Sequence, residues 1–232
     1  MGSFRGVFFR AVATSGRASA PILIVAACLL SSQGLRAADA PLDRARLEEA
    51  VSKYDGNAVR PMGRAVLPEL VRMYEAADED GREKIAAIFY QLKWRSPEAK
   101  RVLMKDIHTR HQALRLHVQY ALGSVSDDLD VVDALVDNME HDENPFFRDK
   151  AACSLAYDQI HLTPKQKAHL FERLIEALSS PVLQVRQIAL QALHIHTGQS
   201  KGFQPNAAES LRSRQIEEWK KWLVQYRASL VP

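Results

Sequence analysis

Cysteine is nearly absent from this chain. Its 232 residues include only Cys28 and Cys153, and Cys28 lies in an N-terminal segment that we expect to be removed. A single remaining thiol excludes an intrachain disulfide and a haem attachment motif. Cys153 falls on an apolar helical stripe beside Ala152 and Leu155, so we expect a small buried residue there. Without covalent cross-links the protein depends on packing, and a mature chain of about 190 residues is ample for a continuous core.

The sequence also lacks the motifs of a catalytic or metal centre. Its ten glycines form no cluster that would cradle a phosphate, and neither a nucleophile elbow nor a dinucleotide fingerprint occurs. His108 and His111 flank a predicted turn, whereas His194 and His196 lie two apart on a predicted helix and so face different sides. No carboxylate or cysteine joins either pair at the spacing of a zinc site. We therefore predict no metal, no cofactor and no enzymatic activity.

Long apolar runs are missing except for one, Ala18 to Leu30, which is too short to span a bilayer comfortably. It follows a stretch whose only charged residues are arginines, as in a cleaved secretory signal. Small residues suited to a signal peptidase follow at Ala37, Ala38 and Ala40. The sequence thus predicts a signal peptide over residues 1–40 and export to the periplasm or envelope of a bacterium.

A lipid anchor is the alternative to a cleaved, unanchored form. The segment from Val25 to Cys28 is similar to a bacterial lipobox, in which cleavage is followed by lipidation of the cysteine. Leu29 and Leu30 extend the apolar run beyond Cys28, as expected if this cysteine belongs to the discarded segment. Contact with a membrane is therefore predicted only through a lipid on Cys28.

A surplus of positive charge is absent once the signal segment is removed from the chain that carries the predicted domain, residues 41–232. The whole chain carries 31 basic and 28 acidic residues, a formal net charge of +3. Four arginines precede Asp39, the first acidic residue, so cleavage before that position leaves 27 basic and 28 acidic residues and a net charge near −1. Nucleic-acid binding draws on a surplus of Lys and Arg on one face. A nucleic acid is therefore not expected as a partner.

Helical periodicity is what the sequence does contain. Leu170, Phe171, Leu174 and Leu178 form one apolar stripe, and no segment shows the alternation of half-buried strands, so the predicted fold is all-α. Several helix starts are marked by an N-cap residue followed by proline, which suits the first turn. These marks are Ser96-Pro97, Asn144-Pro145, Thr163-Pro164 and Ser180-Pro181. The predicted helices pair as 64–77 with 82–93, 97–108 with 111–123, 128–141 with 145–157, and 164–179 with 182–196.

A short phrase built around an arginine recurs four times, at Arg82, Arg115, Arg148 and Arg186. The spacings are 33, 33 and 38 residues, and a leucine or aromatic residue follows seven positions after each arginine. A period in this range is typical of stacked helical units that share one core. Atypical helices that cap the two ends of the stack are expected at 42–54 and 207–227.

The second half of the chain resembles a known family. The runs Asp142–Leu155 and Ser180–Leu193 resemble the turn and second helix of a HEAT repeat. The tail from Thr197 to Ala207, followed by Trp219 and Trp222, is similar to the ending of many bacterial HEAT-like repeat proteins of the PBS-lyase type. The resemblance implies a right-handed α–α superhelix of about four helix pairs with capping helices at both ends.

In that family a turn aspartate pairs with the helix arginine of a neighbouring repeat. Asp142 stands six residues before Arg148, as the family pattern requires. The matching positions before the other arginines hold Ala76, Thr109 and Ser180, so a complete ladder is not expected. The resemblance implies a structural, repeat-linking role for Arg82, Arg115, Asp142, Arg148 and Arg186.

The resemblance also implies a noncatalytic scaffold in the cell envelope. Its concave surface, lined mainly by the second helix of each pair, would be presented to a partner protein. Two alternatives stay open: an accessory factor for an exported enzyme, and a bilin-lyase-like enzyme, against which the export signal counts. The candidate binding residues are polar positions on second helices, namely Lys84, His117, Gln119, Gln187 and Gln191.

Overall fold

The computed structural model describes residues 42–230. The chain divides into two units, Met1–Asp39 and Ala40–Pro232, and only the second contains described residues. The predicted signal peptide, its cleavage sites and the lipobox at Cys28 lie outside the described residues. Within residues 42–230, no helix has both the length and the apolar character that a membrane crossing requires.

Every regular element between residues 42 and 230 is a helix, and no strand occurs in this part of the chain, which confirms the all-α prediction. Three of the elements are short 3-10 helices. In chain order they are α1 (Arg44–Ser52), α2 (Gly56–Val59), η1 (Arg60–Met62), η2 (Arg64–Val66), α3 (Leu67–Ala76), α4 (Glu79–Leu92), α5 (Pro97–Leu103), η3 (Met104–Asp106), α6 (Gln112–Val125), α7 (Leu129–His141), α8 (Pro145–Tyr157), α9 (Pro164–Ala177), α10 (Leu183–Thr197) and α11 (Glu209–Ser229).

The N-cap and proline pairs mark most helix starts correctly. The Ser96 hydroxyl accepts a hydrogen bond from the Ala99 amide at 3.1 Å where α5 begins. At α9, Thr163 and Gln166 form a reciprocal capping box. These local bonds satisfy amides that the first helical turn leaves without partners, so short-range chemistry suffices to place these two helices.

The pair at Ser180-Pro181 does not start a helix. The Ser180 hydroxyl accepts from the Val182 amide at 3.2 Å, and α10 begins only at Leu183. Arg186 donates to the carbonyls of Ser180 and Pro181 at 2.7 and 3.0 Å. This arginine holds the two residues in a turn, so the helix begins two residues after the position that Pro181 marks and one residue after the predicted start at 182.

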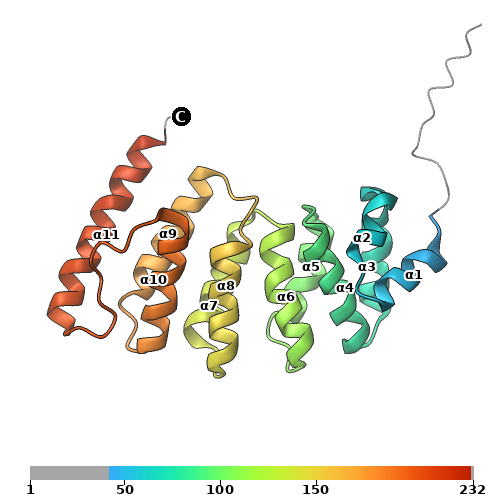
Figure 1. The fold of residues 1–232 in the computed structure, drawn as a ribbon, viewed down its shortest axis with the longest axis horizontal. Helices are drawn as coiled ribbons and strands as arrows, with labels where there is room; N and C mark the ends of the chain where they lie inside the picture. Colours follow the sequence, from blue (N-terminus) through green and yellow to red (C-terminus); the bar gives the residue numbers. More distant parts are fainter. Residues whose placement is uncertain (1–41, 231–232) are drawn as a thin grey trace, which may run out of the picture. The chain divides into compact units, whose positions relative to one another are not determined.

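The helices pack in two rows. The predicted pairs are observed as contacts of α3 with α4, α5 with α6, α7 with α8, and α9 with α10. The second members also contact one another in order, α4 with α6, α6 with α8, and α8 with α10. Figure 1 shows these pairs following one another along the second unit. In the other row α3 contacts α5, α7 contacts α9, and α9 contacts α11.

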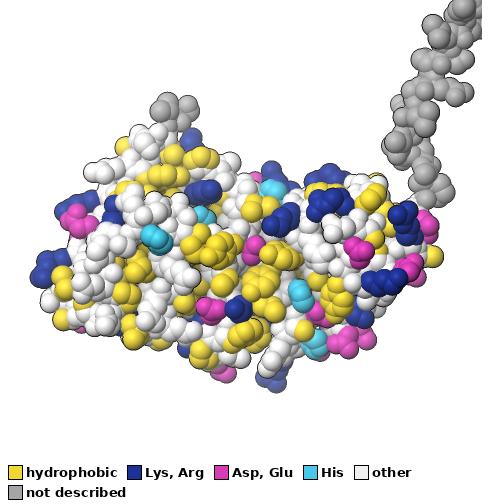
Figure 2. All heavy atoms as spheres, in the orientation of Figure 1, with side chains coloured by type: hydrophobic (Ala, Val, Ile, Leu, Met, Phe, Trp, Pro, Cys, Tyr) yellow, Lys and Arg dark blue, Asp and Glu magenta, His cyan; other side chains and the backbone are white. Residues whose placement is uncertain are grey.

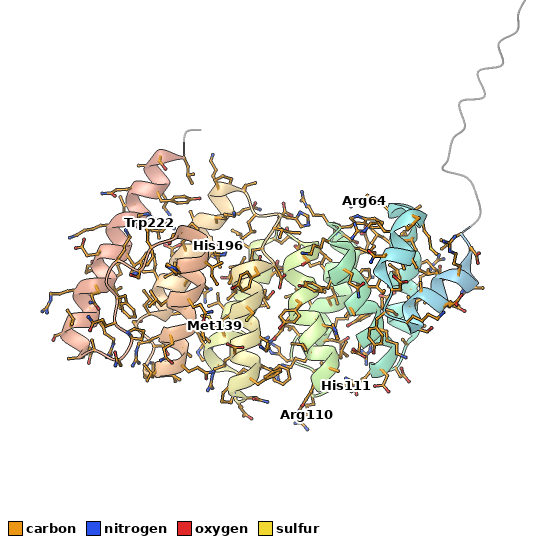
Figure 3. All side chains as sticks on the ribbon, in the orientation of Figure 1. Arg64, Arg110, His111, Met139, His196 and Trp222 are labelled. Carbon is orange, nitrogen blue, oxygen red and sulfur yellow. The ribbon has the colours of Figure 1, made fainter. Side chains whose placement is uncertain are left out.

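One hydrophobic core runs through all the pairs, from Leu47 of α1 to Leu223 of α11. At the C-terminal end, Trp219 is fully buried and the ring of Trp222 lies 5.4 Å from that of Phe171 on α9. The Phe171 ring is in turn 5.6 Å from that of His196, and Figure 3 shows Trp222 and His196 on the neighbouring helices α11 and α10. The aromatic stripe of α11 therefore covers the last helix pair.

We expect Leu193→Ala to lower the free energy of unfolding by about 2–5 kcal/mol, because Leu193 is fully buried in this core and truncation leaves a cavity. Gln191 on the same helix is exposed, so Gln191→Ala is expected to cost less than about 0.5 kcal/mol. Urea denaturation of both variants measures the difference. Equal losses would contradict the helix phase described here.

Candidate functional site

Two of the predicted binding residues, Lys84 and His117, are half-buried on the second row and both lie close to the Tyr54 ring. Nδ1 of His117 lies 3.0 Å from a carboxylate oxygen of Glu83, and the Tyr54 hydroxyl donates to the other oxygen at 2.5 Å. The Lys84 ammonium lies 6.0 Å from the centre of the Tyr54 ring. Burial of the hydroxyl and its bond to Glu83 raise the pKa of Tyr54 to about 12, with the bond as the larger cause. Tyr54 therefore stays neutral at physiological pH.

Gln187 and Gln191 lie apart from this group, exposed on α10. Gln191 borders a small hollow of about 10 Å³ between α8 and α10, together with Cys153 and Tyr157. Cys153 is half-buried rather than fully buried, because it lies at the rim of the contact between these helices. Burial raises the pKa of its thiol, which disfavours the reactive thiolate.

Gln119 is not on the surface, so its assignment to the binding face is wrong. It is fully buried, and its carbonyl accepts from the Ser154 hydroxyl of α8 at 2.7 Å. Each second helix packs against its own partner and against the next second helix, so the buried arc of α6 is wider than its apolar stripe. Neither atom of the Gln119 side-chain amide has a hydrogen-bond partner among the described residues.

A set of aromatic side chains on the same side of the second row was not predicted from the sequence. Tyr90 and Tyr120 form a pair with ring centres 5.6 Å apart, while Phe146 and Tyr157 are 49% and 61% exposed. Figure 2 shows hydrophobic side chains gathered over α6 and α8 on this side of the second unit. Aromatic residues at helix positions outside the apolar stripe were the signal available in the sequence. We call this set the aromatic face: Tyr54, Tyr90, Tyr120, Phe146 and Tyr157.

Lysines accompany the aromatic face. The Lys93 ammonium lies 5.7 Å from the centre of the Tyr90 ring, and that of Lys150 lies 5.1 Å from the centre of the Phe146 ring. Lys84, which lies at Tyr54, and Lys93 belong to α4 and its C-cap, and Lys150 belongs to α8, so two of the second helices carry a cation against an aromatic ring. Such contacts contribute about 0.5–1 kcal/mol each at exposed sites, and they keep the aliphatic part of each lysine on the surface.

Asp158 lies beneath this face and is almost completely buried. Burial raises its pKa from 3.8 to about 6, against the opposing effects of Lys93 and of a hydrogen bond with Tyr90. Gly123 of α6 makes room for the segment, because a Cβ there would lie 2.7 Å from the Gln159 amide nitrogen and 3.1 Å from Asp158 Cβ. Glycine at position 123 therefore allows the loop after α8 to pack closely against α6.

The four repeat arginines each reach the next layer of helices. Arg82 of α4 donates to both carboxylate oxygens of Asp106 at 3.1 Å, and Arg115 of α6 pairs with Asp142. Asp106 was missed by the sequence analysis because it stands nine residues before Arg115, not six.

The other two arginines find neutral acceptors in the next layer. Arg148 of α8 donates to the Gln184 side chain of α10 at 2.8 and 3.0 Å, and to the Asp142 carbonyl at 2.8 Å. Arg186 of α10 donates to the Pro205 carbonyl ahead of α11 at 2.6 Å. All five predicted ladder residues thus take part in contacts between or within turns, and none of them belongs to the aromatic face.

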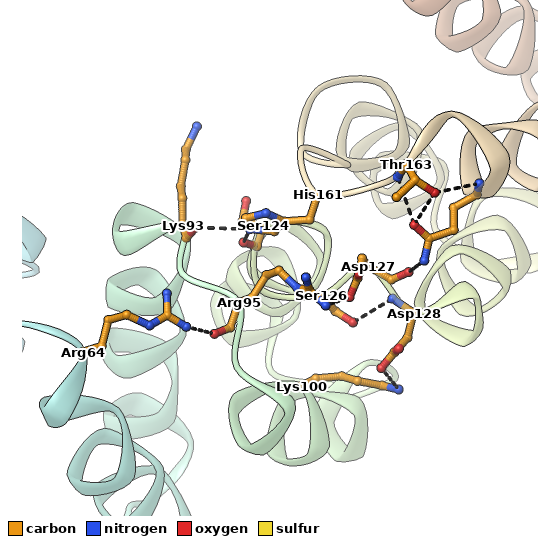
Figure 4. A network of polar contacts seen from close by, with 11 residues as sticks. Arg64, Lys93, Arg95, Lys100, Ser124, Ser126, Asp127, Asp128, His161 and Thr163 are labelled. Atoms are coloured by element: carbon orange, nitrogen blue, oxygen red, sulfur yellow. Dashed lines mark hydrogen bonds and ion pairs between the residues drawn. The ribbon is translucent and has the colours of Figure 1, made fainter. Parts of the chain in front are cut away.

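A second hollow lies at one edge of the helix rows, where the loops after α4, α6 and α8 meet. We call it the loop-edge groove; its volume is about 630 Å³. Figure 4 shows the polar network that lines it. Among its lining residues are Arg64, Lys93, Trp94, Arg95, Asp127 and His161.

His161 ties the three loops of the groove together. Its Nε2 lies 2.9 Å from the Ser124 carbonyl and 3.2 Å from the Lys93 carbonyl, so it acts as a donor to the ends of α6 and α4. Across the groove Arg95 pairs with Asp127 at 2.6 Å. The walls are therefore held by tertiary contacts rather than by regular secondary structure.

One histidine of each pair makes a structural contact. His111 caps α6 by accepting from the Leu114 amide at 3.2 Å, and Nε2 of His196 lies 2.8 Å from the Leu155 carbonyl. Among residues 42–230 no group of three or more His, Cys, Asp or Glu side chains is arranged to hold a metal ion.

No protein-family model, curated protein or solved structure matches this chain.

The raised pKa of Asp158 predicts that the free energy of unfolding depends on pH. Its folded-state pKa of about 6 exceeds the ordinary 3.8, so the native state favours the neutral carboxyl and loses stability as pH rises from about 4 to 7. Asp158→Asn keeps a neutral side chain of similar shape and removes this loss. We expect the variant to gain roughly 1–3 kcal/mol over the native protein at pH 7 and little at pH 4.

Urea denaturation at pH 4 and pH 7 measures both values. The matched control is Glu143→Gln, which neutralises an exposed carboxylate and is expected to shift stability by less than about 0.5 kcal/mol at either pH. A gain for Asp158→Asn that is equal at the two pH values would contradict the burial of an ionisable carboxyl.

Proposed function

We propose that this protein is a noncatalytic, exported scaffold that binds a partner protein through the aromatic face. The observation that carries the proposal is the alignment of half-buried and exposed aromatic rings on the successive second helices α4, α6 and α8, accompanied by lysines at α4 and α8. Tyrosine and phenylalanine are enriched at protein interfaces, where rigid rings bury large areas at low entropic cost. The positions Lys84 and His117 belong to this surface, while Gln187 and Gln191 extend it onto α10.

The proposed architecture is a HEAT-like right-handed α–α superhelix of four helix pairs, α3–α4 to α9–α10, capped by α1 and α11. The helix pairing, the two rows and the single core support it. The arginines that reach from each second helix to the next layer are also consistent with the turn-to-helix ladder of that family. In this proposal every layer buries its apolar faces against its neighbours.

We further propose that the second row lies on the concave side. Contacts between neighbouring second helices are continuous from α4 to α10, whereas α5 and α7 in the first row make no comparable contact. A stack whose layers approach more closely on one side curves toward that side. The aromatic face would then line the concave surface, where one extended partner can touch several layers.

Exposed aromatic residues that a monomer does not need for its core favour binding over a purely structural role. Phe146→Ala together with Tyr157→Ala removes two exposed rings without opening the core. We expect the double variant to lose at least about tenfold in partner recovery, since two interface anchors contribute more than 1 kcal/mol each. Quantitative mass spectrometry after affinity capture from envelope extract measures the loss.

The matched control is Val224→Ala on α11, which truncates a side chain that is 66% exposed but remote in sequence and layer. It is expected to recover the same proteins as the native chain. If no protein is enriched over a blank resin, or if the double variant recovers the same set, the proposed function fails.

Export is the part of the proposal that rests on residues 1–40. In a bacterial host we expect the mature chain to begin after Ala37 or Ala40, which mass spectrometry of the purified N-terminus will determine directly. A chain beginning at Cys28 with the added mass of lipid would instead establish the anchored form. An intact Met1 in the envelope-free fraction would contradict export altogether.

A further inference from the structure

The loop-edge groove carries more positive charge than its own carboxylates compensate. Asp127 is already paired with Arg95 at 2.6 Å, and Asp128 accepts from Lys100 at 2.8 Å. Lys100 also reaches Asp130 at 2.6 Å. The acidic side chains of the groove therefore have cationic partners within the protein.

Two cations that line the groove, Arg64 and Lys93, and one that lies beside it at Trp94, Arg60, form no ion pair with a carboxylate of residues 42–230. Arg60 donates to the carbonyls of Gln91 and Leu92 at 2.7 and 3.4 Å, and Arg64 donates to the Arg95 carbonyl. Neither guanidinium forms an ion pair with a carboxylate of residues 42–230. Because a guanidinium has five N–H donors, these bonds leave donors on both side chains for a further acceptor.

Lys93 is the third cation. It caps α4 in the left-handed conformation, with φ at +56°, and is exposed. The buried carboxyl of Asp158 feels its charge, but the two groups form no ion pair. Lys93 lines the groove and at the same time lies over Tyr90 of the aromatic face.

Arg60 and Arg64 lie against the same side chain, Trp94. The guanidinium carbons of Arg60 and Arg64 lie 6.0 and 5.9 Å from the centre of its ring. Contact with the ring restrains both side chains at the entrance of the groove, so less side-chain entropy is lost when an anion binds. The indole is also a built-in reporter for occupancy of this site.

The groove continues into the aromatic face. Its third wall is the loop after α8, which begins beyond Tyr157 and carries Ile160 with 46% of its surface exposed. A chain lying over Tyr157 and Ile160 therefore reaches the groove without leaving the surface. Lys93, which belongs to both surfaces, marks the point where they join.

From this arrangement we infer that the loop-edge groove binds carboxylates of an acidic segment in the same partner protein that occupies the aromatic face. The inference rests on the proposed function and adds the chemistry of the partner: acidic residues next to aromatic or aliphatic ones. Arg60, Arg64 and Lys93 supply charge-assisted hydrogen bonds. The paired Asp127 and Asp128 in the groove would repel a dense anionic membrane surface, whereas they leave room for a few carboxylates directed at the arginines.

The test uses a synthetic peptide of alternating glutamate and tyrosine, with a glutamine and tyrosine peptide as the neutral counterpart. We expect the acidic peptide to bind the mature protein at least about tenfold more tightly, and its affinity to fall with added salt. The NMR signal of the Trp94 indole is expected to shift on binding. Equal affinity for both peptides, or an unshifted Trp94 signal at saturation, overturns the inference.

Variants locate the site. Arg64→Gln combined with Lys93→Asn removes two charges while keeping an amide donor at position 64 and a residue that tolerates the left-handed conformation at position 93. We expect about tenfold weaker binding of the acidic peptide. Arg110→Gln is the matched control, because Figure 3 shows Arg110 at the opposite edge from Arg64, and it is expected to bind as the native protein does. Thermal melting confirms that each variant is folded, and Lys93→Asn alone serves if the pair is not.

Two further experiments test whether the groove instead binds a free anion or an anionic membrane surface. Inorganic phosphate is expected to compete only weakly, and phosphatidylglycerol vesicles are expected to bind no better than neutral phosphatidylcholine vesicles. Vesicle binding that depends on Arg64 and Lys93 and exceeds peptide binding overturns the inference in favour of a membrane surface. Full competition by phosphate without any preference for the acidic peptide overturns it in favour of a free anion.

Failure here is distinguishable from failure of the proposed function. Capture of a partner can depend on Phe146 and Tyr157 and yet be unchanged in the variant that lacks the charges at Arg64 and Lys93. In that case the proposed function stands and the acidic segment is contradicted. If neither partner capture nor acidic-peptide binding is observed, both the proposed function and this inference fail.

Discussion

The close contact of each second helix with the next one is the constraint on which the rest of this structure depends. Small residues at these contacts allow it. A Cβ on Gly123 would lie 3.1 Å from the Ser154 hydroxyl, and Ala152, Ala156 and Ala192 line the junction of α8 with α10. The dispersion energy of such packing is spread over many atoms, and the repeat arginines then add directed hydrogen bonds from layer to layer. A larger side chain at position 123 would separate two layers and interrupt the core on both sides of it.

This same contact determines where the surface features lie. Because the second helices are close, side chains that leave the core from α4, α6 and α8 emerge next to one another. Tyr90 and Tyr120 can then pair across two layers at 5.6 Å, although 30 positions separate them in the sequence. The loops that follow the same helices also meet, which produces the loop-edge groove. Binding surface and groove are thus two consequences of one packing arrangement.

Much of the fold follows from local sequence signals. N-cap residues, prolines and apolar spacing suffice to predict the helix pairs, because each signal acts within a few residues. What could not be predicted depends on tertiary contacts. Gln119 is polar and was assigned to the surface, yet α8 covers it. The short helix α2 contains Gly56, a poor helix former; the Gln91 side chain stabilises it by accepting from the Gly56 amide and donating to the Tyr54 carbonyl, both at 2.9 Å.

The candidate site was less predictable than the fold for the same reason. Lys84 and His117 were chosen as polar positions on second helices, a criterion that excludes aromatic residues by construction. The contribution of Tyr90 or Tyr157 becomes visible only when the layers are stacked. Likewise Asp106 was not recognised as the partner of Arg82, because the turn that contains it is a 3-10 helix and its register differs from that of Asp142.

The loop after α8 shows that the polar interior and the surface are linked. Gln119, Ser124 and Gln159 have buried side-chain atoms without hydrogen-bond partners among the described residues, and each such group costs about 1–3 kcal/mol. Because Asp158 and Gln159 are buried, the next two residues are placed at the surface: Ile160 is exposed to solvent and His161 lies in the groove wall. A core chosen for stability alone would fill these positions with apolar residues. We interpret the buried polar groups as holding this loop in position. The position of the loop in turn keeps the aromatic face continuous with the groove.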